Sequence, residues 1–73
     1  MRDAIAYVPG QRIALADIAR NGHAFTITMR PVPYLDRDEV RYWMFVVGMN
    51  GTPMSEHHHL STAFSAVERY AVV

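Results

Sequence analysis

The chain has 73 residues, 51% of them hydrophobic, and no cysteine, so we expect one small folded domain, residues 1–73, without disulfides or thiolate metal sites. Seven arginines balance seven acidic residues, and this net charge of zero weakens any nucleic-acid role, because binding to phosphate backbones depends on excess cation. No apolar run is long enough to span a membrane, and the N-terminus lacks the apolar core of a signal peptide, so we expect a cytoplasmic protein.

The first predicted elements are a short apolar stretch and a helix. Residues 4–8 end at Pro9-Gly10 and could form an edge strand or a covering arm. Residues 11–20 are alanine-rich, and Asn21-Gly22 follows as a plausible helix C-cap. Asn-Gly is also a hairpin signal, and Ile13, Leu15 and Asp17 alternate with alanines in this stretch. Helix propensity of the alanines favours the helix.

Three strands are predicted next. Residues 23–30 alternate between apolar and polar side chains, and Pro31-Val32-Pro33 is expected to end that strand, because proline cannot donate to a ladder. Residues 36–39 then form an acidic tip. Residues 40–49 are rich in β-branched and aromatic side chains and run into Asn50-Gly51, which predicts a long strand and a turn. Residues 52–59 favour a third, shorter strand, although Thr52 could instead cap a helix.

The last predicted element is a helix with Ser61 as N-cap that runs to about Ala71, since Leu60, Phe64 and Val67 follow helical spacing. The expected fold is therefore α+β, a three-stranded antiparallel sheet with helices packed on one face, in the order α-β-β-β-α. This order is similar to that of the double-stranded-RNA-binding domain family. In that family the last helix opens with a basic cluster, whereas residues 61–65 carry no cation here, so the family's function is not carried over.

The predicted strand 40–49 is apolar on both faces, so other parts of the chain or a partner must cover both. Side chains alternate across a strand, so one face carries Val40, Tyr42, Met44 and Val46. Two short helices can cover only one sheet face, and a contiguous apolar surface that stays exposed usually marks an interaction site. The alternative is that the two termini fold across that surface. The predicted partner-binding residues are those of the second face: Arg41, Trp43, Phe45, Val47 and Met49.

The predicted function is a non-enzymatic protein-binding module. It would present this apolar face, with Trp43 and Phe45 as anchors, to a homodimer mate or to another protein, as an accessory or inhibitor protein of a phage or plasmid does. The alternative is a small nucleic-acid-binding domain in which Arg30 and Arg41 act together with the aromatic side chains of the sheet.

Other chemistry finds less support in the sequence. In an extended segment His57 and His59 would share a face and could chelate a metal with His23 or Glu56, but we expect His57, His58 and His59 to be surface residues. Asp36, Asp38 and Glu39 are expected to form a solvated turn. No nucleophile elbow, phosphate loop or dinucleotide motif is present, so we predict no catalytic residues, no bound metal and no cofactor.

Overall fold

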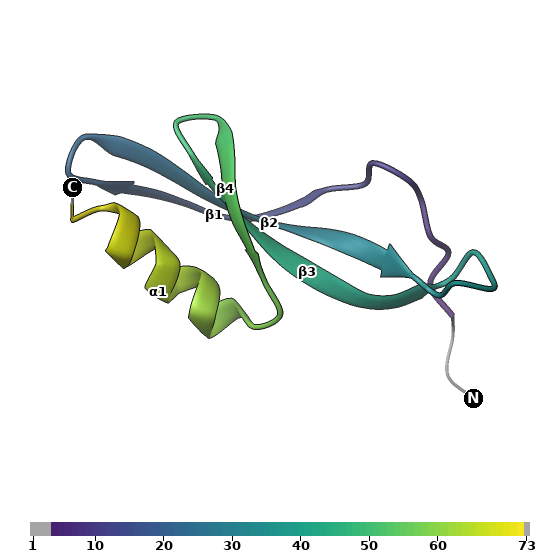
Figure 1. The fold of residues 1–73 in the computed structure, drawn as a ribbon. Coiled ribbons are helices and arrows are strands. Elements are labelled where there is room, and N and C mark those ends of the chain that lie inside the picture. The colour runs from purple at the N-terminus through teal and green to yellow at the C-terminus, as the bar shows by residue number, and fades with distance from the viewer. Residues whose placement is uncertain (1–3, 73) are drawn as a thin grey trace.

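A computed structural model describes residues 4–72 as a β-meander followed by one helix (Figure 1). The sheet is antiparallel, with its four strands in sequence order. Its elements are β1 (Ile13–Arg20), β2 (His23–Pro33), β3 (Val40–Met49), β4 (Thr52–His57) and α1 (Leu60–Tyr70).

The predicted fold class is wrong in its first element, because residues 11–20 do not form a helix. Most of this stretch is strand β1, which gives a β-β-β-β-α order and a four-stranded sheet instead of three strands with two helices. Asn21 and Gly22 have φ angles of 51° and 81°, as a two-residue hairpin turn requires. Pairing with β2 and burial against the core therefore override the helix propensity of the alanines. This order of elements is no longer similar to that of the double-stranded-RNA-binding domain family.

The other boundaries differ less from the prediction. β3, β4 and α1 form where strands and a helix are predicted, but α1 begins at Leu60 with His59 at its N-cap, and not after Ser61. β2 continues to Pro33 instead of ending before Pro31. Its pairing with β1 stops at Met29, so the later part of β2 has a free edge on which a proline costs no ladder hydrogen bond.

The core lies between α1 and one face of the sheet. Phe25, Ile27 and Val47 are no more than 1% exposed and pack with Val67 and three alanines of the α1 segment. These alanines are Ala63, Ala66 and Ala71. Small side chains let the helix backbone approach the strands closely, as dense packing requires.

The C-terminal end of α1 is tied to the turn between β1 and β2. The Asn21 side-chain amide donates a hydrogen bond to the carbonyl oxygen of Ala71. Arg20 and Glu68 add an ion pair at 3.4 Å between two exposed side chains, which contributes little to stability. The helix is therefore fixed over the half of the sheet that contains this turn (Figure 1).

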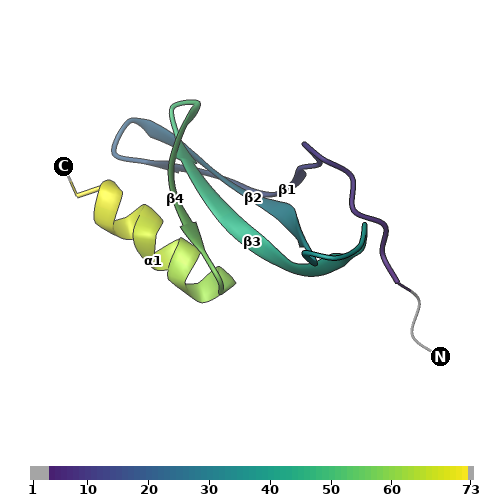
Figure 2. The same cartoon turned by 45° about the vertical axis from the view of Figure 1, so that its right-hand side comes forward.

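α1 is too short to cover the sheet. Its 11 residues span ~16 Å at 1.5 Å each, whereas the 10 residues of β3 span ~33 Å. The far halves of β2 and β3 extend beyond the helix as a two-stranded ribbon (Figure 2). The molecule is correspondingly elongated, with extents of 45 × 20 × 19 Å and a radius of gyration of 13.9 Å, against about 11 Å for a compact domain of this length.

The N-terminal arm, residues 4–12, covers the opposite face of this ribbon. It pairs with the start of β3 through a hydrogen bond of 2.8 Å from Val40 N–H to the Ile5 carbonyl, and then crosses to β1 on the other side of β2 (Figure 1). Met44 points away from α1 on this ribbon and is only 9% exposed. Of the two alternatives for residues 4–8, the covering arm is the better description.

Candidate protein-binding surface

An apolar surface remains on the α1 side of the sheet where the helix ends. In the strand register Ile13, Met29 and Phe45 lie in one cross-strand row, and Pro31 lies opposite Trp43 in the next. Residues directly opposite in an antiparallel pair share a face, so these five side chains lie on the same side as the buried Ile27 and Val47. We call Ile13, Met29, Phe45 and Trp43 the ribbon surface. Each of the four is at least partly exposed.

The structure divides the predicted partner-binding residues between the core and this surface. Val47 is completely buried under α1, and Met49 packs against the same core. Phe45 also packs against this core at the end of the ribbon surface, whereas Trp43 lies further out. Both are half-buried, and Arg41 is exposed beyond them. The prediction therefore needs one correction: α1 covers part of this face, and Val47 is not accessible to a partner. A binding role for the accessible residues stays a prediction.

Sequence reasoning missed Ile13 and Met29 as members of the surface. Ile13 was assigned to a helix, which hid its alignment with Met29 and Phe45. The alternation of apolar residues along 13–17, combined with the Asn-Gly turn, is the pattern that could have identified the strand.

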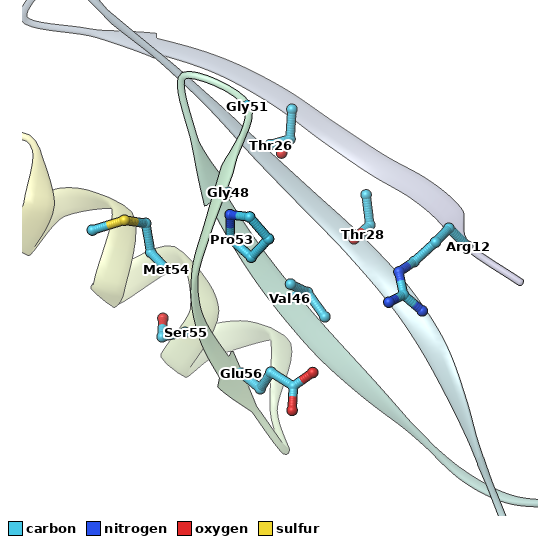
Figure 3. Close-up of a pocket in the computed structure, with 10 residues that line it drawn as sticks. All are labelled: Arg12, Thr26, Thr28, Val46, Gly48, Gly51, Pro53, Met54, Ser55 and Glu56. Atoms are coloured by element: carbon cyan, nitrogen blue, oxygen red, sulfur yellow. The ribbon is translucent and has the colours of Figure 1, made fainter. Parts of the chain in front are cut away.

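The face away from α1 carries an open hollow of about 460 Å³ (Figure 3). Thr26 and Gly48 are cross-strand neighbours in it, and a Cβ atom on Gly48 would lie 2.7 Å from Thr26 Oγ1. Glycine is therefore required for this close approach. The hollow is lined by short side chains and by the charged Arg12 and Glu56 at its rim.

Arg30 and Glu56 form a bidentate ion pair on this same face. The distances are 2.5 Å from Arg30 Nε and 2.8 Å from Nη2 to the two carboxylate oxygens, the parallel geometry that guanidinium and carboxylate prefer. Hydrogen bonding to Arg30, helped by its charge and that of Arg12, lowers the pKa of Glu56 against a smaller opposing effect of burial. The same contact raises the pKa of Arg30.

Glu56→Gln is expected to reduce the free energy of unfolding at neutral pH by at most about 1 kcal/mol, since the pair is partly exposed to solvent. The pKa of Glu56 is lower in the folded than in the unfolded chain, so the stabilisation is complete above the unfolded value near 4.5 and disappears as the pH falls through the folded value.

Urea unfolding at neutral and acidic pH measures this dependence, with Glu68→Gln as control because the Arg20–Glu68 pair is more exposed. Wild type should lose more stability on acidification than Glu56→Gln, whereas Glu68→Gln should follow the wild type. An equal loss for Glu56→Gln and wild type would contradict the role given to the pair.

The two arginines of the nucleic-acid alternative have different surroundings. Arg30 pairs with Met44 in the strand register, whereas Arg41 is the extra residue of an irregularity between Val40 and Tyr42, and its guanidinium lies 5.9 Å from the centre of the Tyr42 ring. The charge of Arg30 is compensated by Glu56, which leaves less positive charge for binding phosphate.

The histidines are separated from one another. His57 Nε2 lies 2.7 Å from Ser55 Oγ, and the ring of His58 lies 5.8 Å from that of Tyr42. His23 contacts Asn50 near the opposite end of the sheet. Within residues 4–72, no three histidine, aspartate or glutamate side chains are grouped so that they could hold a metal ion.

Arg37 compensates part of the charge of the acidic tip. Arg37 bonds to Asp36 at 3.2 Å and to Glu39 at 3.1 Å, and its guanidinium stacks on the Tyr34 ring at 3.8 Å. Leu35 beside it is fully exposed. The tip is a charged turn in which the arginine pairs with two of the three carboxylates.

In the part of the chain that the structure describes, α1 is the single helix, and it is too short and too polar to cross a membrane. No protein-family model, curated protein or solved structure matches this chain.

Proposed function

We propose that the chain is a non-enzymatic protein-binding module that docks apolar side chains of another protein, or of a second copy, on its ribbon surface. The observation that supports the proposal is the mismatch in length between β3 and the single helix that covers it. The mismatch leaves Trp43 and Phe45 partly exposed on two adjacent apolar rows. A cytoplasmic location and a role as an accessory or inhibitor protein belong to the same proposal.

The energetics of docking favour such a role. Full burial of a large apolar side chain contributes roughly 1.5–3 kcal/mol, so covering the exposed parts of Trp43, Phe45 and Ile13 adds a few kcal/mol. A core of this size rarely supplies more than ~3–5 kcal/mol, so a partner on this surface would stabilise the fold by a comparable amount. Tryptophan is also among the residues that most often anchor interfaces.

The polar side chains offer little for catalysis. Ser55 and His57 are in contact, but within residues 4–72 no carboxylate is hydrogen-bonded to the His57 ring to orient it, as a nucleophilic triad requires. The hollow on the opposite face is open, and of the two charged residues that line it, Arg12 and Glu56, the second is paired with Arg30. Binding is therefore the function that these residues support best.

The test compares Trp43→Ser with Tyr42→Ser in the organism that carries the gene. Tyr42 is the neighbouring residue on the opposite face and is also partly exposed. Size-exclusion of cell extracts should show the wild type and Tyr42→Ser in a complex larger than one chain of 8.3 kDa, and Trp43→Ser shifted to the free chain. Circular dichroism confirms that both variants are folded, and an unchanged complex with Trp43→Ser would refute the proposal.

A further inference from the structure

The outer edge of β1 is a free strand edge that lies apart from Trp43 and Phe45 of the ribbon surface. β1 pairs only with β2, and within residues 4–72 no backbone hydrogen bond reaches its other side. The strand contains no proline, which would remove a backbone donor from the edge. The other edge, β4, is shorter and contains Pro53. β1 is therefore the edge that can accept another strand.

A β-bulge in β1 determines which side chains lie on which face. Ala14 pairs with Thr28 and Asp17 with Thr26, so Leu15 is the extra residue. Thr26 and Thr28 share a face, and Ala14 and Asp17, although three residues apart, therefore lie on that face as well. Arg12 lines the hollow on this same face. A two-residue turn is flanked by a hydrogen-bonded pair, here Arg20 and His23, and bonded and non-bonded pairs alternate from there along the ladder. Asp17 and Ala14 fall at non-bonded pairs with Thr26 and Thr28, so their N–H and C=O groups face the free edge.

The three residues have a symmetric spacing. Counted along β2, Asp17 lies two positions from Ala14 in one direction, opposite Thr26. Arg12 directly precedes Ile13, the first residue of β1 and the partner of Met29, so continuing the strand by one residue places Arg12 two positions from Ala14 in the other direction. We infer that two copies of this chain pair antiparallel through their β1 edges about a twofold axis at Ala14, with Arg12 of each copy opposite Asp17 of the other. The product is a continuous eight-stranded sheet with two intermolecular ion pairs.

The charged groups are available for this contact. Arg12 and Asp17 are exposed, and neither forms an ion pair within residues 4–72. The Arg12 guanidinium bonds only to the carbonyl of the adjacent Gln11 in that part of the chain. In the proposed register opposite charges face each other on both sides of the axis, and opposite-charge cross-strand pairs stabilise a sheet. The net charge of zero adds no general repulsion between copies.

The apolar side chains of β1 support a second copy as the occupant. Ile13 and Leu15 are 37% and 42% exposed, and the same register brings Ile13 of each copy beside Leu15 and Ala16 of the other. The chain also exposes 5209 Å², about 600 Å² more than the ~4,600 Å² expected for a compact monomer of this mass. A standard interface buries ~800 Å² per partner, so this excess is of the size that a dimer would remove.

A charge-swap experiment tests the register with the full chain. Light scattering should give the wild type twice the mass of one 8.3 kDa chain. Arg12→Asp and Asp17→Arg each place like charges opposite each other at both contacts, so each should weaken the dimer about tenfold or more. An equimolar mixture of the two variants restores both opposite-charge contacts and should return to the wild-type affinity as a heterodimer, as should the double swap Arg12→Asp with Asp17→Arg.

The outcomes separate this inference from the proposed function. A monomeric wild type, single variants that dimerise like the wild type, or a mixture that fails to recover the dimer each overturn the β1 pairing. A monomeric wild type would also exclude a second copy as the partner on the ribbon surface. The other two results leave complex formation through Trp43 unaffected, because Trp43 lies on β3, two strands away from the edge. Circular dichroism of the single variants checks that these exposed substitutions leave the sheet intact.

Discussion

Phe25→Ala is expected to unfold the isolated chain or to leave it only marginally folded. Phe25 is 1% exposed and belongs to a core of few large side chains. Replacing a buried phenylalanine by alanine costs about 3–5 kcal/mol through lost burial and the cavity left behind. A domain of this size rarely has more than ~3–5 kcal/mol in total, so the loss is comparable to the whole stability of the fold.

Phe64→Ala provides a matched control, because it removes the same side chain from a position on α1 that is 42% exposed. Thermal and urea unfolding followed by circular dichroism should show a lost or strongly lowered transition for Phe25→Ala. Phe64→Ala should change the free energy of unfolding by less than about 1.5 kcal/mol, since a half-exposed ring contributes only part of its burial energy. Similar losses for the two variants would contradict the assignment of the core.

The second large effect is expected from Ala66→Leu in the contact between α1 and the sheet. Ala66 is completely buried, so a leucine has no space unless the helix moves away from the strands. Overpacking of this kind typically costs 1–3 kcal/mol, although leucine is itself a good helix former. The substitution should therefore lower the stability in spite of its favourable helix propensity.

Ser65→Leu is the control, since the preceding residue is exposed on the same helix. Leucine has a higher helix propensity than serine, so this variant should unfold at the wild-type urea concentration or slightly above it. Urea unfolding of both variants separates the two effects. Equal stability of Ala66→Leu and Ser65→Leu would mean that the helix does not pack closely on the sheet.

Periodicity predicted the elements with the strongest local patterns. The alternation of residues 23–30, the aromatic and β-branched run 40–49 and the helical spacing from Leu60 all correspond to elements of the structure. Residues 11–20 were wrongly predicted because their alanines favour a helix locally, whereas pairing with β2 is a contact that the isolated segment does not contain. That error removed a strand from the sheet and gave it a second covering helix.

The candidate site was predictable only in part for the same reason. The alternation of β3 correctly placed Trp43 and Phe45 on one face with Val47 and Met49. Which face α1 covers, and how far along it, depends on the anchoring of the helix end by Asn21 and on the length of the helix. The bulge at Leu15, which aligns Arg12 with Asp17, has no local sequence pattern that would reveal it.

The central claim is that the part of the sheet that α1 leaves uncovered is a protein-binding surface. Photo-crosslinking tests it most directly, with a benzophenone amino acid placed at Trp43 and, as control, at Tyr42 on the opposite face. In cells that carry the natural partner, the account predicts a discrete crosslinked product from position 43, at twice the chain mass if the partner is a second copy, and little or none from position 42. Equal labelling from the two positions, or no product from position 43, would contradict it.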